Sequence, residues 1–438
     1  MSSQEYTYPF SLEGGRKAVI DVGLDGQPLA VDLDIDGKAV EHGLEIVSKV
    51  LEISDGEAIS DIHFRTDRHV YVNTVSGPRI LDEFGRLSSN QVAGVLLALV
   101  YNRNSAIAMS RSLQKHERES LGRALTIQRK VDFSCEGGDT ATLFGAAGES
   151  SALKRGRMRV QAHFSATGLG ITCRILRESI MSLEETGLPP DIIQSLTTLV
   201  QKKSGLGLVT GATGSGKSTT LSALVEWARR NLKRHIVTIE DPIEYHYKDT
   251  VSLKGGREVP SNSLITQQEV GRDVISFQKG IHEALRKKPD IILLGEIRDG
   301  ETMEACMEAA QTGHLVLSTL HTRGAARTLS RIMEFFPADW QPAALKRLSE
   351  TLLFILSQGL LPPESGEKYA LAVEYLKNSS ISTRSAIAKY YSNSATLEDE
   401  LPQGGNLSWE ASLQNLYSHR LISQDTMKEF SLDQKEKK

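Results

Sequence analysis

Apolar segments alternate with amphipathic segments over the second half of the chain. Four short apolar segments, GLGLVT, HIVTIED, DIILLGE and HLVLSTLH, begin at positions 205, 235, 290 and 314 and predict strands. The segment after the first strand carries apolar residues at helical spacing: Leu221, Leu224, Val225, Ala228 and Leu232. Strands that are apolar throughout and separated by helices are typical of a parallel sheet covered on both faces. The pattern therefore predicts an α/β core.

The first half of the chain shows shorter and more polar alternation. A helical pattern at 42–53 precedes SDIHFR and VYVNTV, in which apolar and polar residues alternate as in half-buried strands. A second helix is predicted near 89–113, and residues 157–176 predict two strands joined at a TGLG turn. Together these elements predict one α+β domain.

The chain is expected to divide into five segments. The Pro-Pro pair in SLEETGLPPD (182–191) marks the main boundary, and residues 136–154, rich in Gly, Ala and Ser, predict a surface loop. Polar helices are expected near 408–418 and 423–431. The expected segments are an N-terminal extension (1–40), the α+β domain (41–177), a linker (178–190), the α/β core (191–380) and a C-terminal helical segment (381–438).

Composition narrows the functional class. The 438 residues carry a net charge of −4 and are 39% hydrophobic and 24% charged, as in ordinary soluble proteins. A dedicated nucleic-acid binder is more often basic, so no direct contact with nucleic acid is expected. The three cysteines form no CxxC pair, which disfavours a zinc site or a disulfide framework. The longest apolar run (92–101) is about half the ~20 residues that span a bilayer, so we expect a cytoplasmic protein without a transmembrane segment.

A phosphate-binding loop follows the first predicted strand of the core. The segment GATGSGKS fits the spacing GxxxxGK[ST], with an apolar strand before it and an amphipathic helix after it. Glycines let backbone N–H groups turn toward a β-phosphate, Lys217 supplies a charge for the β- and γ-phosphates, and the Ser218 hydroxyl is a ligand for Mg²⁺. ATP with Mg²⁺ is therefore the expected ligand. The expected nucleotide-binding residues are Gly211, Ala212, Thr213, Gly214, Ser215, Gly216, Lys217, Ser218 and Thr219.

Three carboxylates follow the second predicted strand. The segment TIEDPIEY places Glu240, Asp241 and Glu244 beyond the carboxyl end of a strand, where ligands bind in open α/β sheets. Two interpretations are open: a solvated acidic loop, and a group that supports Mg²⁺ or orients the nucleophile. Beside a phosphate-binding loop the second is favoured, with Glu240 and Asp241 as possible metal ligands and Glu240 and Glu244 as possible catalytic groups.

A fourth carboxylate lies within the segment IILLGEIRD (291–299). Glu296 follows an apolar strand, and a carboxylate beside the γ-phosphate can orient the attacking water. Gly295 offers no metal ligand, so Mg²⁺ is expected to rest on Ser218, the phosphates and water, with help from the acidic segment. His314 and His321 flank the next strand. Both are expected at the phosphate edge of the sheet as γ-phosphate sensors, with a structural role as the alternative.

These motifs resemble those of a known superfamily. GATGSGKSTT, TIEDPIEY, GEIRD and TGHLVLSTLHT are similar, in kind and order, to the P-loop, aspartate box, atypical Walker B segment and histidine box of the ATPases of type II secretion, type IV secretion and type IV pili. Within that superfamily the chain most resembles the PilT retraction motors, with the DotB and TraJ transfer ATPases as a close alternative. It lacks the four-cysteine module that extension motors of the PilB and GspE kind often carry.

The resemblance implies an architecture and an assembly. It implies a RecA-like P-loop NTPase core of the α/β class, preceded by a PAS-like α+β N-terminal domain. The implied assembly is a homo-hexamer that hydrolyses ATP to drive an inner-membrane platform protein by changing the angle between the two domains. Arg159 and Arg174 match arginines that approach the phosphates in such proteins, where they can stabilise transition-state charge. The alternative for each is an ordinary surface arginine of a strand.

Departures from the family pattern bear on function. Gln268 stands where the family has an arginine, and AIAKYYSN at 386–393 differs from the C-terminal signature of the retraction motors. Residues 1–40 and 136–154 are also atypical. A plasmid-transfer or type IVB secretion motor fits these departures at least as well as a pilus motor. Two further classes stay open: a RecA-like nucleic-acid translocase, and a nucleotide-dependent scaffold that does not hydrolyse ATP.

Overall fold

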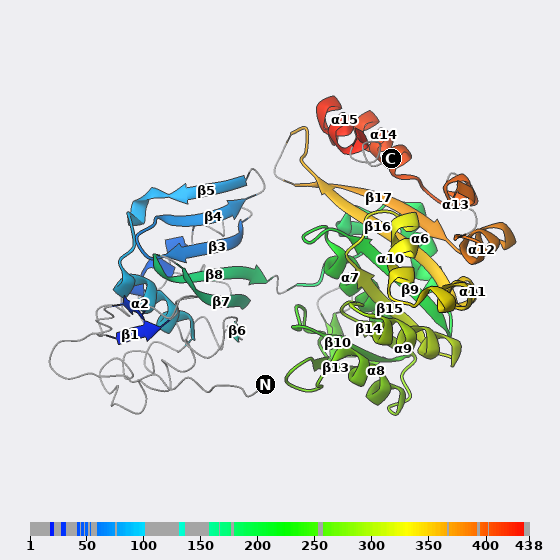
Figure 1. Ribbon diagram of the computed structural model, residues 1–438, viewed down its shortest axis with the longest axis horizontal. Coiled ribbons are helices and arrows are strands. Elements are labelled where there is room, and N and C mark those ends of the chain that lie inside the picture. The colour runs from blue at the N-terminus through cyan, green and yellow to red at the C-terminus, as the bar shows by residue number, and fades with distance from the viewer. Residues whose placement is uncertain are drawn as a thin grey trace. The chain divides into compact units, whose positions relative to one another are not determined.

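The computed structural model divides the chain into two compact units. Met1–Glu178 is the N-terminal unit and Ser179–Lys438 is the C-terminal unit (Figure 1). The predicted loop at 136–154 and most of the predicted extension at 1–40 lie outside the described residues. The structure describes residues 18–21, 28–31, 42, 43, 45–47, 49, 50, 53, 59–74, 77–100, 131–135, 157–165, 167–176, 179–252, 257–365, 368–391, 395–401 and 403–432.

The N-terminal unit contains a six-stranded sheet in the order β5-β4-β3-β8-β7-β6, in which every described pair of neighbours is antiparallel. The predicted strands SDIHFR and VYVNTV are confirmed as β3 and β4. Apolar residues of alternating strand positions, such as Ile62 and Phe64, are buried in one cluster with Val92 and Val95 of helix α2. Bounds are β1 Ala18–Asp21, β2 Pro28–Val31, β3 Ile59–Arg65, β4 Val70–Thr74, β5 Gly77–Leu81, α2 Ser89–Val100, β6 Val131–Cys135, β7 Arg157–Ser165 and β8 Gly168–Leu176.

The helix predicted near 89–113 is observed as α2 as far as Val100, and residues 101–113 lie outside the described part of the chain. The two strands predicted within 157–176 are β7 and β8, which pair from Arg157 with Leu176 to Ser165 with Gly168. The described positions within 42–53 are helical. The N-terminal unit is therefore a mixed unit of an antiparallel sheet with helical cover.

The C-terminal unit is built on a seven-stranded sheet in the order β13-β10-β14-β15-β9-β16-β17. All neighbours in it are parallel except β16 and β17. The predicted parallel sheet is thereby confirmed. The strands are β9 Gly205–Gly211, β10 His235–Glu240, β13 Leu264–Glu269, β14 Ile291–Leu294, β15 Leu315–Leu320, β16 Leu352–Leu361 and β17 Ala370–Lys377.

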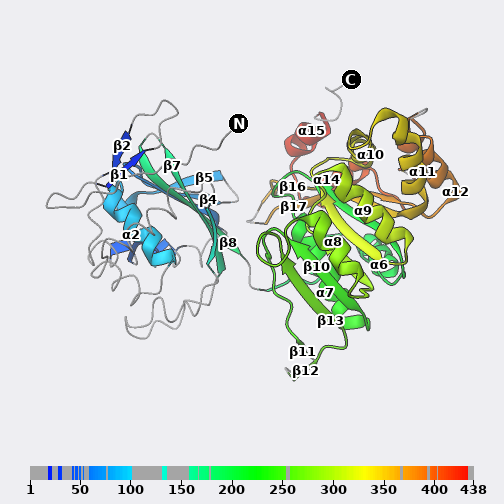
Figure 2. The ribbon, with the colours of Figure 1, turned by 60° about the horizontal axis from the view of Figure 1, so that its bottom comes forward.

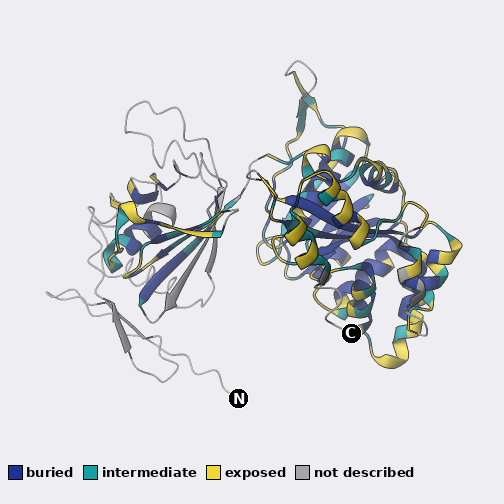
Figure 3. Cartoon of the chain, turned by 90° about the horizontal axis from the view of Figure 1, so that it is seen from above, coloured by how far each residue is buried: buried dark blue, intermediate teal, exposed yellow. Residues whose placement is uncertain are grey.

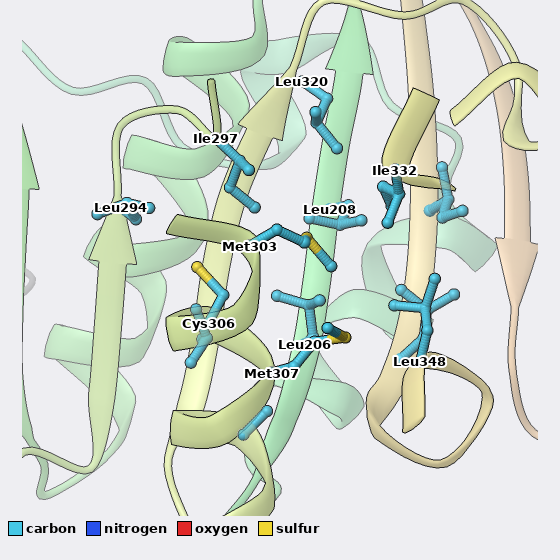
Figure 4. Packing of buried hydrophobic residues seen from close by; sticks show 14 of the residues in the cluster. Leu206, Leu208, Leu294, Ile297, Met303, Cys306, Met307, Leu320, Ile332 and Leu348 are labelled. Carbon is cyan, nitrogen blue, oxygen red and sulfur yellow. The ribbon is translucent and has the colours of Figure 1, made fainter. Parts of the chain in front are cut away.

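Helices cover both faces of this sheet, as apolar strands without alternation require. One face packs against α8 (Phe277–Leu285), α9 (Gly300–Gln311), α10 (Ala325–Glu334), α11 (Gln341–Thr351) and α12 (Ile381–Ala388). Figure 4 shows part of that cluster, where Met303 and Met307 of α9 lie over Leu206 and Leu208 of β9. The other face packs against α6 (Pro190–Leu199) and α7 (Lys217–Asn231). Coloured by burial, the strands form a dark layer beneath helices with exposed outer faces (Figure 3).

The C-terminal helices close one edge of the sheet. The predicted helices near 408–418 and 423–431 are observed as α14 (Trp409–Ser418) and α15 (Gln424–Leu432), which share a small apolar cluster with β16 and β17. The short helix α13 spans Ala395–Glu400. At the other end of the unit, a hairpin of β11 (Thr250–Ser252) and β12 (Glu258–Pro260) extends away from the sheet (Figure 2). None of the helices in the described part of the chain has the length and apolar character that a bilayer crossing requires.

The central strand β9 is so closely packed at Gly207 that a residue with a side chain does not fit there. A Cβ atom at Gly207 would lie 2.5 Å from Cε1 of Phe354 and 2.9 Å from Cδ2 of Leu317. Gly207→Ala is therefore expected to lower the free energy of unfolding of the C-terminal unit by about 1–3 kcal/mol, the usual cost of overpacking a core. Urea unfolding of the purified chain measures this change.

The control for this prediction is Phe354→Leu, alone and combined with Gly207→Ala. Because the leucine removes the ring that the added methyl group meets, the alanine should cost less in the Phe354→Leu background. An equal cost in both backgrounds would contradict the proposed contact.

Candidate nucleotide-binding site

The loop between β9 and α7 forms an open backbone cradle. Gly211, Gly214 and Gly216 have φ angles of 144°, 81° and 87°, values that favour glycine. A Cβ at Gly211 would lie 2.4 Å from the carbonyl oxygen of Gln358 and 2.5 Å from Oγ of Ser215, so this position has no room for a side chain. Ideal Cβ atoms at Gly214 and Gly216 would meet nothing within 4 Å, so the loop is open above these two residues.

Lys217 lies inside this cradle. Its ammonium group donates to the carbonyl oxygens of Gly211 and Ala212, each at 2.9 Å, and the residue is only 7% exposed. Burial lowers the pKa of Lys217, and the nearby charges of Glu296 and Glu244 oppose that shift. Both carboxylates are therefore within electrostatic reach of the lysine, although they come from different strand ends.

Two polar groups of the cradle fit a phosphate ligand. The hydroxyl of Ser215 is buried and has no hydrogen-bond partner among the described residues, so it is available to an oxygen entering the cradle. The N-terminus of α7 begins at Lys217, and a helix N-terminus favours anions. Gln358 of β16 donates to Oγ1 of Thr220 at 2.9 Å, which fixes the first turn of this helix against the neighbouring strand.

The donor set also fits Mg²⁺ that is held mainly by phosphate and water. Ser218, the predicted ligand, is exposed at the start of α7. In the described ranges no group of three or more His, Cys, Asp or Glu side chains is placed to hold a metal ion. Among the described residues, Ser218 thus offers a hydroxyl, and Mg²⁺ accepts such a site because it retains several waters.

Glu240 ends β10 with its side chain directed into the protein. It is 8% exposed and its Oε1 accepts hydrogen bonds from Oγ1 of Thr238 at 2.7 Å and from Nε2 of Gln267 at 3.3 Å. Burial raises the pKa of Glu240 to about 7; the charge of Glu244 adds to the rise and the hydrogen bonds from Thr238 and Gln267 oppose it. A buried, internally bonded carboxyl of this kind is suited to holding structure together.

The acidic loop after β10 is fixed from two sides. On one side Gln267 of β13 donates to the carbonyl oxygen of Tyr245 at 2.8 Å and accepts from the backbone N–H of Tyr247 at 3.1 Å. On the other side the hydroxyl of Tyr245 lies 3.3 Å from Oγ1 of Thr219 in α7, the helix that follows the glycine-rich loop. Neither Gln267 nor Tyr245 was expected in the site: Gln267 begins the polar run QQEVGRD, and Tyr245 is the last residue of the acidic segment TIEDPIEY.

Glu296 follows the end of β14 and lies between the side chains of Arg298 and His321. The backbone before it is anchored on both sides. The N–H of Gly295 donates to the carbonyl oxygen of Ile239 at 2.8 Å, and the carbonyl oxygen of Gly295 accepts from the hydroxyl of Thr319 at 2.7 Å. Oε2 of Glu296 lies 3.0 Å from Nε2 of His321, and Oε1 accepts from the guanidinium of Arg298. Glu296 and His321, each expected at the carboxyl edge of the sheet, therefore lie side by side there, and the contact with Arg298 was not expected from the sequence.

The prediction that His314 shares this edge is wrong. His314 precedes β15, and its carbonyl oxygen accepts from the N–H of Gly205, the first residue of β9. Because β15 runs parallel to β9 for six residues, His314 lies about 20 Å along the strand from the phosphate edge. Its Nδ1 lies 3.1 Å from the carbonyl oxygen of Ala309 in α9, so this histidine closes a helix end.

Arg159 and Arg174 belong to the N-terminal unit, whereas the cradle belongs to the C-terminal unit. Arg159 on β7 lies directly opposite Arg174 on β8 in the antiparallel pair. Nε of Arg174 donates to Oδ1 of Asp61 at 2.8 Å. Burial raises the pKa of Asp61, but hydrogen bonds from Arg174 and Ser60 and the charge of Arg174 outweigh it, so the pKa lies below its ordinary value. The side chain of Arg159 lies outside the described part of the chain.

Comparison with known proteins identifies the relatives of this chain. A family described as "Type II/IV secretion system protein" matches residues 152–397, more than half of the chain. The uncharacterised protein YggR of Escherichia coli is 42% identical over 204 residues, which cover 47% of this chain and 58% of YggR. The chain spans about half the length of the curated relatives it matches.

Solved structures resemble nearly the whole chain. The pilus retraction motor PilT with bound ADP is 30% identical, has a TM-score of 0.65 and is matched over 88% of this chain and 96% of its own. The Legionella pneumophila ATPase DotB is 23% identical, has a TM-score of 0.70 and shares the fold over 89% of this chain and 95% of its own. The expected resemblance and the expected α/β class with a RecA-like core are both confirmed.

Replacing Glu240 by Gln is expected to remove a pH dependence of stability. The pKa of Glu240 is raised from 4.5 to about 7 in the folded chain, so between these values the folded state binds more protons than the unfolded state. The free energy of unfolding should therefore fall as pH rises through this window, by about 3 kcal/mol from this group. Urea unfolding at about pH 5 and about pH 8 should show a smaller decrease for Glu240→Gln than for the wild type. The same decrease in both proteins would refute the assignment.

Proposed function

The chain belongs to the type II/IV secretion system protein family, and we propose that it is an ATPase that drives a type IV pilus or a type IV secretion or conjugation machine. The observation that carries the proposal is the arrangement around Lys217. Its ammonium group lies among the carbonyl oxygens of an open glycine-rich loop, with Glu296 and Glu244 within electrostatic reach. A cation, backbone donors and a nearby carboxylate are the groups that phosphoryl transfer from ATP requires.

The first task of these residues is to bind the phosphates. The loop from Gly211 to Gly216 and the N-terminus of α7 present backbone N–H groups. The hydroxyl of Ser215, which has no hydrogen-bond partner in the described part of the chain, adds a donor. Lys217 exchanges its contacts with loop carbonyls for contacts with phosphate oxygens. Because it is already desolvated in the cradle, little further desolvation is required when the anion binds.

The second task is to support the metal and orient water. Mg²⁺, when bound, neutralises phosphate charge and fixes the phosphate oxygens for in-line attack. Ser218 is the residue that would hold it, and Asp241, at the exposed start of the acidic loop, is better placed than the buried Glu240 to support it through water. Glu296 orients the attacking water and accepts its proton. His321, whose Nε2 lies 3.0 Å from Oε2 of Glu296, senses the γ-phosphate.

The remaining predicted residues take supporting parts in this proposal. Glu240 holds the acidic loop through its buried hydrogen bonds, and Glu244 adjusts the charge around Lys217. Arg159 and Arg174 are proposed to stabilise transition-state charge in a homo-hexameric ring. Support for the ring comes from the likeness to PilT and from family membership. The ring would act from the cytoplasm on an inner-membrane platform protein, with PilT-like retraction and DotB-like or TraJ-like transfer as the two forms of that work.

Lys217→Ala is expected to lower ATP turnover at least about a hundredfold, because it removes a preorganised positive charge from the developing phosphate charge. Phosphate release from purified protein measures the loss. The matched control is Lys203→Ala, which removes an exposed lysine that precedes β9 at the opposite edge of the sheet. Turnover by Lys217→Ala at more than about a tenth of the wild-type rate would contradict the assignment of the cradle.

Glu296→Gln is expected to retain ATP binding and to lose about 10²–10³-fold in turnover, because an amide can keep the contacts of the side chain but accepts no proton from water. Binding of a fluorescent ATP analogue and phosphate release separate the two effects. Glu244→Gln is the companion variant. If Glu296→Gln hydrolyses ATP normally and Glu244→Gln does not, the catalytic carboxylate is Glu244.

A further inference from the structure

Arg298 contacts both carboxylates that end neighbouring strands of the phosphate edge. Its Nε and Nη2 donate to Oε1 of Glu296, which follows β14, and its Nη2 also lies 3.3 Å from Oδ2 of Asp241, which follows β10. A single nitrogen atom therefore contacts an oxygen of each acid. Without a cation at this point, two carboxylates at the ends of adjacent strands would repel each other.

The guanidinium is itself held in place by a third element. The Cζ atom of Arg298 lies 5.5 Å from the centroid of the Phe277 ring, at the first residue of α8. The ring is 7% exposed and therefore rigid, and a guanidinium within about 6 Å of an aromatic centroid is attracted to it. The planar group also carries donors in a fixed fork, which a lysine lacks. Arg298 is thus restrained although its own side chain is 57% exposed.

The opposite side of Glu296 is held by His321. Arg298 contacts Oε1 and His321 contacts Oε2, so both carboxylate oxygens of Glu296 have a partner. The side chain of Glu296 is only 19% exposed. Removing His321 would leave one oxygen held by Arg298. Removing Arg298 would leave the carboxylate with the contact of half-exposed His321 as its remaining hydrogen bond among the described residues, beside an Asp241 that had lost its cation. Arg298 is therefore the contact that fixes the direction of Glu296.

We propose that Arg298 is a positioning residue, which clamps Glu296 and Asp241 together and sets the orientation of the Glu296 carboxylate for water. The role in hydrolysis rests on the proposed ATPase function. Arg298 acts through Glu296. Its removal should therefore reduce the rate of the chemical step and leave nucleotide binding by the glycine-rich loop unchanged.

The chain offers a matched control for this residue. Arg331 on α10 donates to Oε2 of Glu334 at 2.7 Å and lies 4.8 Å from the centroid of the Phe335 ring. It is an exposed arginine with the same two kinds of partner, but both of them belong to the end of its own helix. A loss of activity that comes merely from removing a surface arginine, its ion pair and its ring contact should appear in Arg331→Gln as well.

The first experiment compares Arg298→Gln, Arg298→Lys and Arg331→Gln in the full-length chain. For Arg298→Gln we expect kcat to fall about tenfold or more, with the KM for ATP and the Kd of a non-hydrolysable analogue changed less than about threefold. Arg298→Lys should recover part of the loss because it restores the charge but not the fork. Unchanged kcat in Arg298→Gln, or an equal loss in Arg331→Gln, would overturn the proposal.

The second experiment needs no turnover and tests the clamp itself. Thermal unfolding of wild type, Glu296→Gln, Arg298→Gln and the double variant forms a double-mutant cycle. If the two side chains interact, the shift in unfolding temperature of the double variant differs from the sum of the single shifts, and additive shifts overturn the clamp. A wild type that binds but does not hydrolyse ATP would refute the proposed function, while the cycle would still decide whether Arg298 holds Glu296.

Discussion

Parallel pairing of β9, β15, β14 and β10 is the constraint on which the candidate site depends. Because these neighbours run in the same direction, their carboxyl ends meet at one edge of the sheet. Gly211 and Glu240 are the last residues of β9 and β10, and Glu296 and His321 follow β14 and β15. Residues separated by up to 110 positions in the sequence are thereby brought to one edge of the sheet. The same rule places His314, which precedes its strand, at the opposite edge.

The acids that cluster at this edge would repel one another if all were charged and unpaired, and each is stabilised in a different way. Glu240 is buried and internally hydrogen-bonded, and its pKa is raised to about 7. Asp241 and Glu296 share the guanidinium of Arg298. Glu244 lies within reach of the charge on Lys217. Protonation or a neighbouring cation thus reduces the repulsion between these acids, so the edge can hold several carboxyl groups before any metal ion binds.

The edge strand β13 contributes to the site without carrying a catalytic group. Its Gln267 fixes the backbone of the acidic loop through Tyr245 and Tyr247, and the Tyr245 hydroxyl meets Thr219 of the P-loop helix. These contacts join the outermost strand of the sheet to the start of α7. A change in the position of β13 would therefore reach the residues next to Ser218 through two hydrogen-bonded steps.

Local sequence determined the features that depend on neighbouring residues. The spacing from Gly211 to Ser218 specified the cradle, and four apolar segments specified β9, β10, β14 and β15, because backbone conformation and burial pattern are encoded over a few residues. Strand order and register depend on pairings between distant segments, so they were beyond such patterns, whereas the parallel direction was predicted from the strands that are apolar throughout. That is why β13, β16 and β17 were not anticipated. His314 was assigned to the wrong edge because it was grouped with His321, although His314 precedes β15 and His321 follows it. The bonds of Gln267 and the contacts of Arg298 with Asp241 and Phe277 likewise exist only once three separate elements have packed together, and only the tertiary structure decided them.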